Sequence, residues 1–138
     1  GRPVVLVFFG DHQPSIAAAL NDELYPQEDT ASHAFRIHQS TYFVWANYEI
    51  AGNIELNVYD TVGANEIAAM TLNKIGAPLT DYQKALLATR SDVPTINVAG
   101  YLGADGLRYD LESEDSPYTS TIDKLRRVQY LEFATKVQ

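Results

Sequence analysis

The stretch PVVLVFFGDHQPS, residues 3–15, decides the fold. Its first seven residues are apolar or β-prone, without alternation of apolar and polar side chains. Such a run predicts a strand buried on both faces, which is typical of the parallel sheet of an α/β protein. Gly10 ends the run, and Pro14 then opens a helix over residues 16–24. Strand, polar turn and helix form the first half of a βαβ unit.

The rest of the chain predicts short elements of both kinds. A second apolar strand is expected at residues 41–46 (TYFVWA), after a polar segment with a short helix. That helix is expected at residues 31–38, and further helices are expected at 61–75, from Thr80 onward and at 121–136. A loop is expected at residues 51–57. A strand at 94–99, a turn at 103–106 and a return strand at 107–111 complete the prediction. Thr80 is expected to cap its helix, Gly76 to end the helix before it, and Thr119 or Ser120 to cap the last one.

The predicted fold class is α/β with small α+β additions. The length of 138 residues suits a single unit. Within it, we expect residues 1–50 to form a strand–loop–strand part and residues 51–138 a helical and α+β part. Two strong core strands are fewer than a doubly wound domain has, and the first begins almost at the first residue. We therefore expect the chain to be a piece of a longer domain.

Composition excludes several classes of protein. The chain carries 10 Lys and Arg against 18 Asp and Glu, a net charge of −8, which argues against nucleic-acid binding and mildly favours a cationic partner such as a metal. Cysteine is absent, so disulfides and thiolate sites are excluded. The longest apolar run, residues 4–9, falls far short of the ~20 residues that span a bilayer, so we expect a soluble fragment.

Asp11 and His12 are the candidate functional residues, because they directly follow the first predicted strand. In open α/β sheets, ligands bind just beyond the carboxyl ends of the strands. A carboxylate oxygen and an imidazole nitrogen suit Zn²⁺ or Mn²⁺, although a catalytic metal needs about three or four protein ligands. His33 and His38 are further candidates. The alternative is that Asp11 caps the next helix and His12 is a turn residue, and the residues alone leave both interpretations open.

Several short motifs resemble one protein family, in the same order along the chain. PVVLVFFGDHQPS and TYFVWANYEI resemble its F-G-D-H-x-P and T-P-F-x-I-W-x-N-Y segments, and GAPLTDYQKALL, VPTINVAGYLGADG and RRVQYLEF resemble three later ones. The family is that of the lipoteichoic-acid-synthase-like phosphoglycerol transferases, in the sulfatase branch of the alkaline phosphatase superfamily. The resemblance covers nearly the whole chain. It implies the C-terminal portion of an alkaline-phosphatase-like α/β/α sandwich.

The resemblance implies that Asp11 and His12 are metal ligands, as are the Asp and His of the family's G-D-H. The other family ligands, an acidic residue and the nucleophilic Thr, lie upstream, so no residue of this chain is assigned as catalytic and the chain alone is expected to be inactive. The metal implied is Mn²⁺, with Mg²⁺ and Zn²⁺ as alternatives. Thr41-Tyr42 replaces the family's Thr-Pro, which alters a turn and leaves the metal pair unchanged. His33 and His38 match no family ligand position, and we interpret them as solvated loop residues.

The function implied is transfer of a glycerophosphate group from a phospholipid headgroup to a cell-envelope polymer or glycan. A metal-activated Thr oxygen attacks phosphorus, and the phospho-Thr then passes its group to an acceptor alcohol or water. The implied partners are therefore the lipid headgroup and the acceptor. The parent protein is expected to be anchored by upstream membrane helices, with its catalytic domain on the extracellular face of the cell membrane.

Two alternatives stay open. One is another reaction of the superfamily, by a sulfatase, a phosphodiesterase or a phosphoethanolamine transferase, which the upstream nucleophile would distinguish. The other is a binding or scaffold module without catalysis. Outside the metal pair, we expect Trp45 in the core, Asn47 in a turn, and Lys124, Arg126 and Arg127 on a solvated face.

Overall fold

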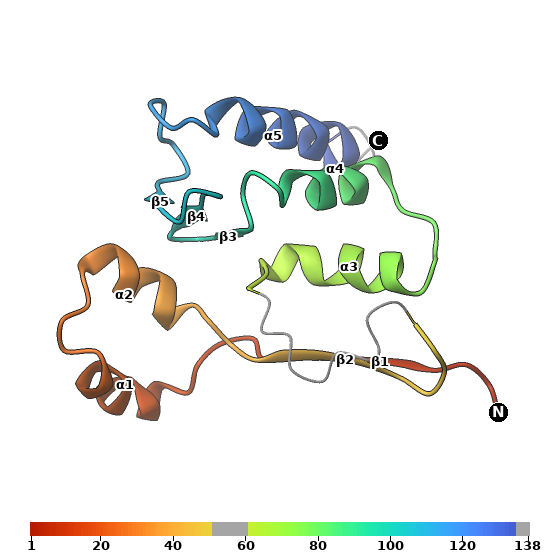
Figure 1. Ribbon diagram of the computed structural model, residues 1–138, viewed down its shortest axis with the longest axis horizontal. Helices are drawn as coiled ribbons and strands as arrows, with labels where there is room; N and C mark the ends of the chain where they lie inside the picture. The colour runs from red at the N-terminus through yellow and green to blue at the C-terminus, as the bar shows by residue number, and fades with distance from the viewer. Residues whose placement is uncertain (51–60, 135–138) are drawn as a thin grey trace.

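The structure is a computed structural model that describes residues 1–50 and 61–134. Within these residues it contains five α-helices and two small antiparallel sheets, so a mixed helix-and-strand class is confirmed (Figure 1). The loop expected at residues 51–57 lies outside the described residues. The elements are β1 (Val5–Phe9), the 3₁₀ turn η1 (Ser15–Ala17), α1 (Ala18–Leu24), α2 (Thr30–Ile37), β2 (Tyr42–Ala46), the 3₁₀ turn η2 (Ala64–Glu66), α3 (Ile67–Lys74), α4 (Asp81–Thr89), β3 (Thr95–Asn97), β4 (Gly100–Leu102), β5 (Arg108–Tyr109) and α5 (Thr119–Phe133).

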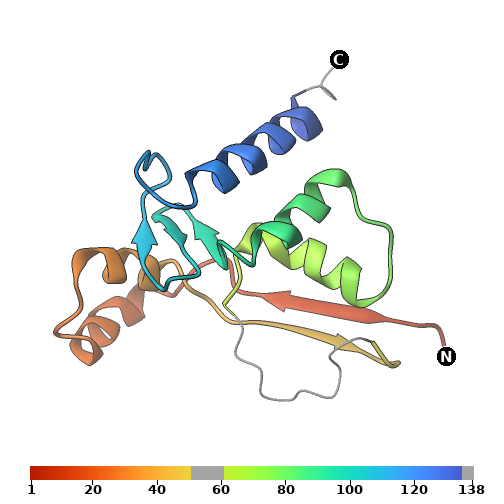
Figure 2. The same ribbon diagram turned by 45° about the horizontal axis from the view of Figure 1, so that its top comes forward.

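β1 and β2 form a two-stranded antiparallel ribbon. Both apolar strands predicted from the sequence are confirmed, and their register runs from Val5 opposite Ala46 to Phe9 opposite Tyr42. Between them the chain passes through α1 and α2, which lie beyond the carboxyl end of β1 (Figure 2). Because β2 returns antiparallel to β1, the two strands do not form a βαβ unit with each other.

The expectation that β1 is buried on both faces is wrong within the described residues. Successive side chains of a strand point to opposite faces, and one face of the ribbon carries half-buried side chains such as Val7. The other, which we call the outer face, carries Leu6, Phe8, Phe43 and Trp45, with exposed fractions of 51, 50, 47 and 51%. The rings of Phe8 and Phe43 stack there with centroids 5.1 Å apart. Trp45, expected in the core, is half exposed because it lies on this face.

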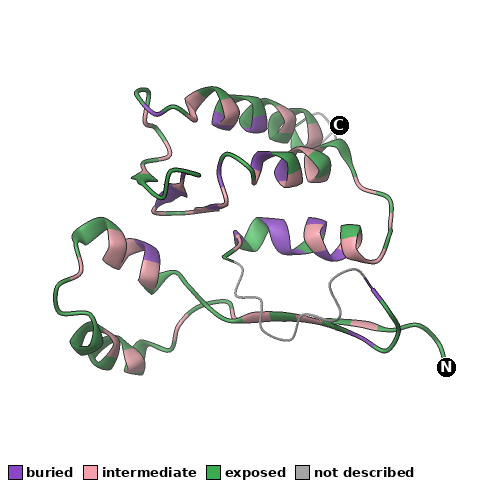
Figure 3. Ribbon diagram, in the orientation of Figure 1, coloured by how far each residue is buried: buried purple, intermediate pink, exposed green. Residues whose placement is uncertain are grey.

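The buried residues gather in α3, α4, α5 and the small sheet β3–β4–β5 (Figure 3). Val93, Tyr101 and Ile122 form a buried cluster between the sheet and α5. Glu66, just before α3, is fully buried, and its carboxylate accepts a hydrogen bond of 2.7 Å from Arg90 at the end of α4. This ion pair joins the start of α3 to the end of α4 across 24 residues of sequence.

Local signals located some boundaries of the helices and missed others. Thr80 caps α4 as predicted, since its hydroxyl accepts a hydrogen bond from the main-chain nitrogen of Gln83 at 3.2 Å. Gly76 follows α3 with a φ of +70°, as expected of a glycine at a helix end. The predicted cap of the last helix is wrong. α5 begins at Thr119, so the cap position is Tyr118, which makes no side-chain capping bond; the hydroxyl of Thr119 donates to the carbonyl of Ser116 at 2.9 Å.

Candidate functional site

The loop after β1 is fixed to the segment that leads into β2. The main-chain nitrogen of Gly10 donates to the carbonyl of Thr41 at 3.0 Å, and the hydroxyl of Ser40 donates to the carbonyl of Gly10 at 2.5 Å. A Cβ atom at residue 10 would lie only 3.0 Å from the Cβ of Ser40. Glycine therefore suits this position because the two segments approach closely. The next two residues, Asp11 and His12, start from a fixed point at the carboxyl end of β1.

The structure brings the side chains of Asp11 and His12 together on the open surface. Oδ2 of Asp11 lies 3.6 Å from Nε2 of His12, and the two side chains are 85 and 74% exposed. Nδ1 of His12 lies 2.8 Å from the carbonyl oxygen of Gln13. Because a carbonyl can only accept, Nδ1 is the donor in this contact, and in the neutral form of the ring the lone pair then lies on Nε2, beside the Asp11 carboxylate.

The chemistry of this pair fits a divalent cation. Two donors that each lie about 2.1 Å from one ion and 3.6 Å from one another subtend an angle of about 118°, which is close to a tetrahedral arrangement. Mn²⁺ with cis ligands needs a shorter separation, and rotation of two exposed side chains can supply it. Metal-binding imidazoles commonly donate their second N–H to a carbonyl, as Nδ1 of His12 does here. Asp11 and His12 could therefore hold two corners of a metal site.

The other two histidines do not extend this pair. Within residues 1–50 and 61–134, no group of three or more His, Asp or Glu side chains is placed to hold a metal ion. His33 lies on α2 and contacts the carboxylate of Asp22 at 3.2 Å, so it is not the solvated loop residue that we expected. His38 is exposed at the end of α2.

Gln13 is a structural part of the site that the sequence did not single out. Its side-chain nitrogen donates to the carbonyl of Arg36 at 2.6 Å, and its side-chain oxygen accepts from Nδ2 of Asn21 at 3.0 Å. Its own carbonyl accepts the proton of His12. Gln13 therefore joins the loop that carries Asp11 and His12 to both α1 and α2. An amide side chain between the polar pair and Pro14 is the only sequence signal that could have indicated this role.

A second polar cluster, also missed from the sequence, lies between α1 and α2. The Arg36 side chain, 12% exposed, donates from Nη2 to Asp22 and from Nε to Glu28, each at 2.8 Å. The hydrogen bond from Arg36, with a smaller one from His33, holds the pKa of Asp22 below its ordinary value of 3.8. The ring of Tyr25 packs on the guanidinium, 4.8 Å from its carbon. Asp22 and Arg36, which are 14 positions apart in the sequence, thus meet in one cluster.

The chain matches no protein-family model, no curated protein and no solved structure. The resemblance described above therefore rests on the short motifs alone. In the part of the chain that the structure describes, no helix combines the length and the apolar character needed to cross a membrane.

Proposed function

We propose that the chain is the C-terminal segment of a metal-dependent phosphoglycerol transferase of the sulfatase branch, and that Asp11 and His12 are two of its metal ligands. The observation that carries the proposal is the position of the pair: Oδ2 of Asp11 and Nε2 of His12 lie 3.6 Å apart on the exposed surface beyond β1. The contact of Nδ1 with the carbonyl of Gln13 also supports it, since in the neutral ring this contact keeps the lone pair on Nε2, the nitrogen beside Asp11.

In this proposal the chain contributes ligands and no nucleophile. A bound Mn²⁺ would activate the hydroxyl of an upstream Thr and neutralise charge on the phosphoryl oxygens. Asp11 supplies a carboxylate, and Gln13 orients the neutral imidazole of His12 through its carbonyl. Because a catalytic metal needs about three or four protein ligands, the pair alone binds the ion weakly. The 138-residue chain is therefore expected to be inactive by itself.

The finer fold in this proposal is an α/β/α sandwich of the alkaline phosphatase type. The outer face of the ribbon supports it, because Leu6, Phe8, Phe43 and Trp45 form an apolar surface of half-exposed side chains. Sheets of α/β proteins carry such side chains on both faces, and a layer of helices covers each face. α3 lies alongside the ribbon in both views (Figures 1 and 2). A second helical layer, supplied by the rest of the domain, would cover the outer face.

The remaining parts of the proposal concern the parent protein. Its donor is a phospholipid headgroup, its acceptor is a hydroxyl of a cell-envelope polymer or glycan, and its catalytic domain lies on the extracellular face of the membrane. The net charge of −8 supports a cationic cofactor and gives no support for nucleic acid as a partner.

Calorimetric titration of the chain with Mn²⁺ tests the ligand assignment. We expect weak, saturable heats for the unmodified chain, and their loss in Asp11→Ala and in His12→Ala. Two matched controls remove an exposed carboxylate and an exposed imidazole elsewhere, Asp115→Ala and His38→Ala, and both should keep the heats. Equal heats in all five proteins would remove the assignment of Asp11 and His12 as ligands.

A further inference from the structure

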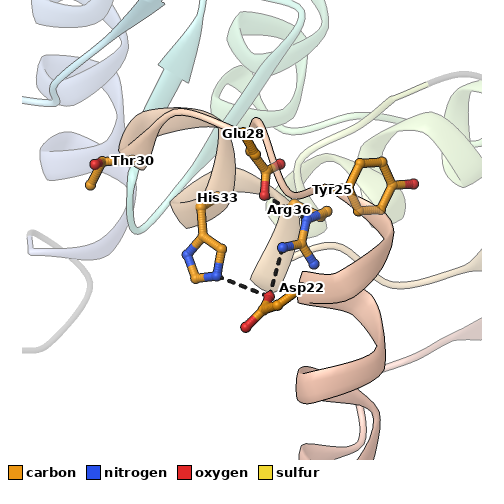
Figure 4. Close-up of a pocket in the computed structure, with 6 residues that line it drawn as sticks. All are labelled: Asp22, Tyr25, Glu28, Thr30, His33 and Arg36. Atoms are coloured by element: carbon orange, nitrogen blue, oxygen red, sulfur yellow. Dashed lines mark hydrogen bonds and ion pairs between the residues drawn. The ribbon is translucent and has the colours of Figure 1, made fainter.

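The cluster around Arg36 borders an open hollow between α1 and α2. The hollow has a volume of about 220 Å³ and is lined by Asp22, Tyr25, Glu28, Thr30, His33 and Arg36 (Figure 4). A water molecule occupies about 30 Å³ in the liquid, so this α1–α2 hollow has room for about seven waters or for one small organic molecule. Its walls offer an aromatic ring, carboxylates, a hydroxyl and an imidazole in one place.

Hydrogen bonds within the cluster hold its charged groups in place and leave some of their polar atoms without a partner among the described residues. Figure 4 shows the guanidinium of Arg36 between the carboxylates of Asp22 and Glu28. Arg36 bonds Oδ1 of Asp22 and Oε2 of Glu28, so the second oxygen of each carboxylate has no protein partner within the described residues. Nη1 of Arg36 is buried and has no acceptor among those residues.

These charges disfavour an anion and weaken the attraction for a cation. An anion in the hollow would face the carboxylates of Asp22 and Glu28 at short range. A cation that approached the free carboxylate oxygens would face the guanidinium between them, which offsets one of the two negative charges. A neutral molecule with hydroxyl groups avoids both penalties, because each hydroxyl can donate to a carboxylate oxygen and accept from an N–H group.

Tyr25 adds an apolar surface to the hollow, which the hydroxyl groups of a ligand would not use. Its ring packs on the guanidinium of Arg36, yet the residue is 54% exposed, so part of the ring is open to a ligand. The C–H groups of a sugar or polyol are apolar and can pack against an aromatic ring while the hydroxyls bond to polar atoms beside it. The ring and the free oxygens belong to the same hollow.

We propose that the α1–α2 hollow is a binding site for a neutral polyhydroxylated ligand, either a polyol or a single sugar ring. Tyr25 packs against the carbon skeleton of the ligand, and the free oxygens of Asp22 and Glu28 accept its hydroxyls. Arg36 holds the two carboxylates in place through its own hydrogen bonds to them. This assignment does not depend on the metal pair, because none of the six lining residues is Asp11 or His12.

Amide and side-chain NMR of the full chain, without metal, tests this site with defined probes. Methyl β-glucopyranoside and glycerol are the neutral probes, and inorganic phosphate and ethylammonium are the charged ones, all at matched ionic strength. We expect saturable shifts of α1 and α2 amides with at least one neutral probe, and NOEs from that probe to the ring protons of Tyr25. The NOEs need no variant, so they report on the site even where a substitution disturbs the fold.

A matched pair of variants assigns the effect to the ring. Tyr25→Ala should weaken the binding of the neutral probe about tenfold. Tyr130→Ala, which removes a tyrosine that is 68% exposed on α5, should leave that binding unchanged. Three results would each overturn the proposal: no saturable shift with either neutral probe, equal binding in Tyr25→Ala, or saturable shifts with only a charged probe. Binding of Mn²⁺ at His12 can be measured on the same sample, so failure of the metal assignment is distinguishable from failure of the hollow.

Discussion

Gln13 donates a hydrogen bond from its side chain to the main-chain carbonyl of Arg36, over 2.6 Å and 23 residues of sequence. Gln13 is also the residue whose own carbonyl accepts the proton of His12. The orientation of a candidate metal ligand and the last turn of α2 are thus connected through one residue. Displacement of α2 would move Gln13, and the position of His12 would change with it.

Replacement of Gln13 by alanine should loosen this connection. Gln13→Ala removes the side-chain hydrogen bonds of Gln13 to the carbonyl of Arg36, which keeps its bond from the main-chain nitrogen of Gln39, and to the amide of Asn21. We therefore expect the free energy of unfolding to fall by about 1 kcal/mol. Urea denaturation measures the change, and Gln129→Ala on the exposed face of α5 is the control. The ¹⁵N shifts of His12 should also move toward a mixture of tautomers. An unchanged midpoint and an unchanged tautomer in Gln13→Ala would show that the bonds of Gln13 do not hold the loop.

The buried pair of Glu66 and Arg90 should be the most sensitive ion pair among those described here. Arg90→Ala removes a donor at 2.7 Å from a carboxylate whose side chain is only 1% exposed, and we expect a loss of about 3 kcal/mol in the free energy of unfolding. Lys84→Ala breaks the exposed pair with Asp81 and should change that quantity by less than about 0.5 kcal/mol. Thermal or urea denaturation of both variants provides the comparison. Similar losses of unfolding free energy in the two variants would contradict the claim that burial makes the pair of Glu66 and Arg90 the more sensitive one.

Tyr109 should give the chain a pH-dependent stability at alkaline pH. The hydrogen bond from its hydroxyl to Asp105, at 2.7 Å, together with partial burial, raises its pKa from 10.0 to about 12. Folding therefore favours the protonated phenol. The resulting stability is fully present below pH 10 and is lost as the pH rises through about 12.

Ultraviolet titration of the tyrosines and denaturation at pH 9 to 12 check this expectation. Tyr109→Phe lacks the group that titrates, so its stability should fall less steeply over the same range. Tyr130→Phe, at an exposed position of α5, should behave like the unmodified chain. Indistinguishable curves for Tyr109→Phe and the unmodified chain would refute the assignment.

The sequence located most elements because their signals are local. An apolar run produced β1, a Thr followed by Gln three residues later capped α4, and Gly76 marked the end of α3. β4 was missed because its three residues, GYL, are too few to show a period. The exposure of Trp45 could not be predicted either. An apolar strand has the same sequence whether or not another layer covers it.

The candidate site likewise has one part that the sequence predicted and another that it missed. Asp11 and His12 are neighbours in sequence directly after a strand, so their position at its carboxyl end followed from the predicted strand alone. The cluster of Asp22, Glu28 and Arg36 forms where the chain turns from α1 into α2, and no repeat in the sequence relates these three residues. His33 was misplaced for that reason: its partner, Asp22, lies on another helix.

Paramagnetic broadening by Mn²⁺ tests the central claim most directly, because it detects weak binding at individual residues. At a small fraction of one equivalent of Mn²⁺, the imidazole signals of His12 and the amide signal of Asp11 should broaden first, and added Zn²⁺ should restore them. The imidazoles of His33 and His38 serve as internal references and should stay sharp. If the three histidines broaden together, or if His33 broadens before His12, then the metal pair that supports the proposed function does not exist.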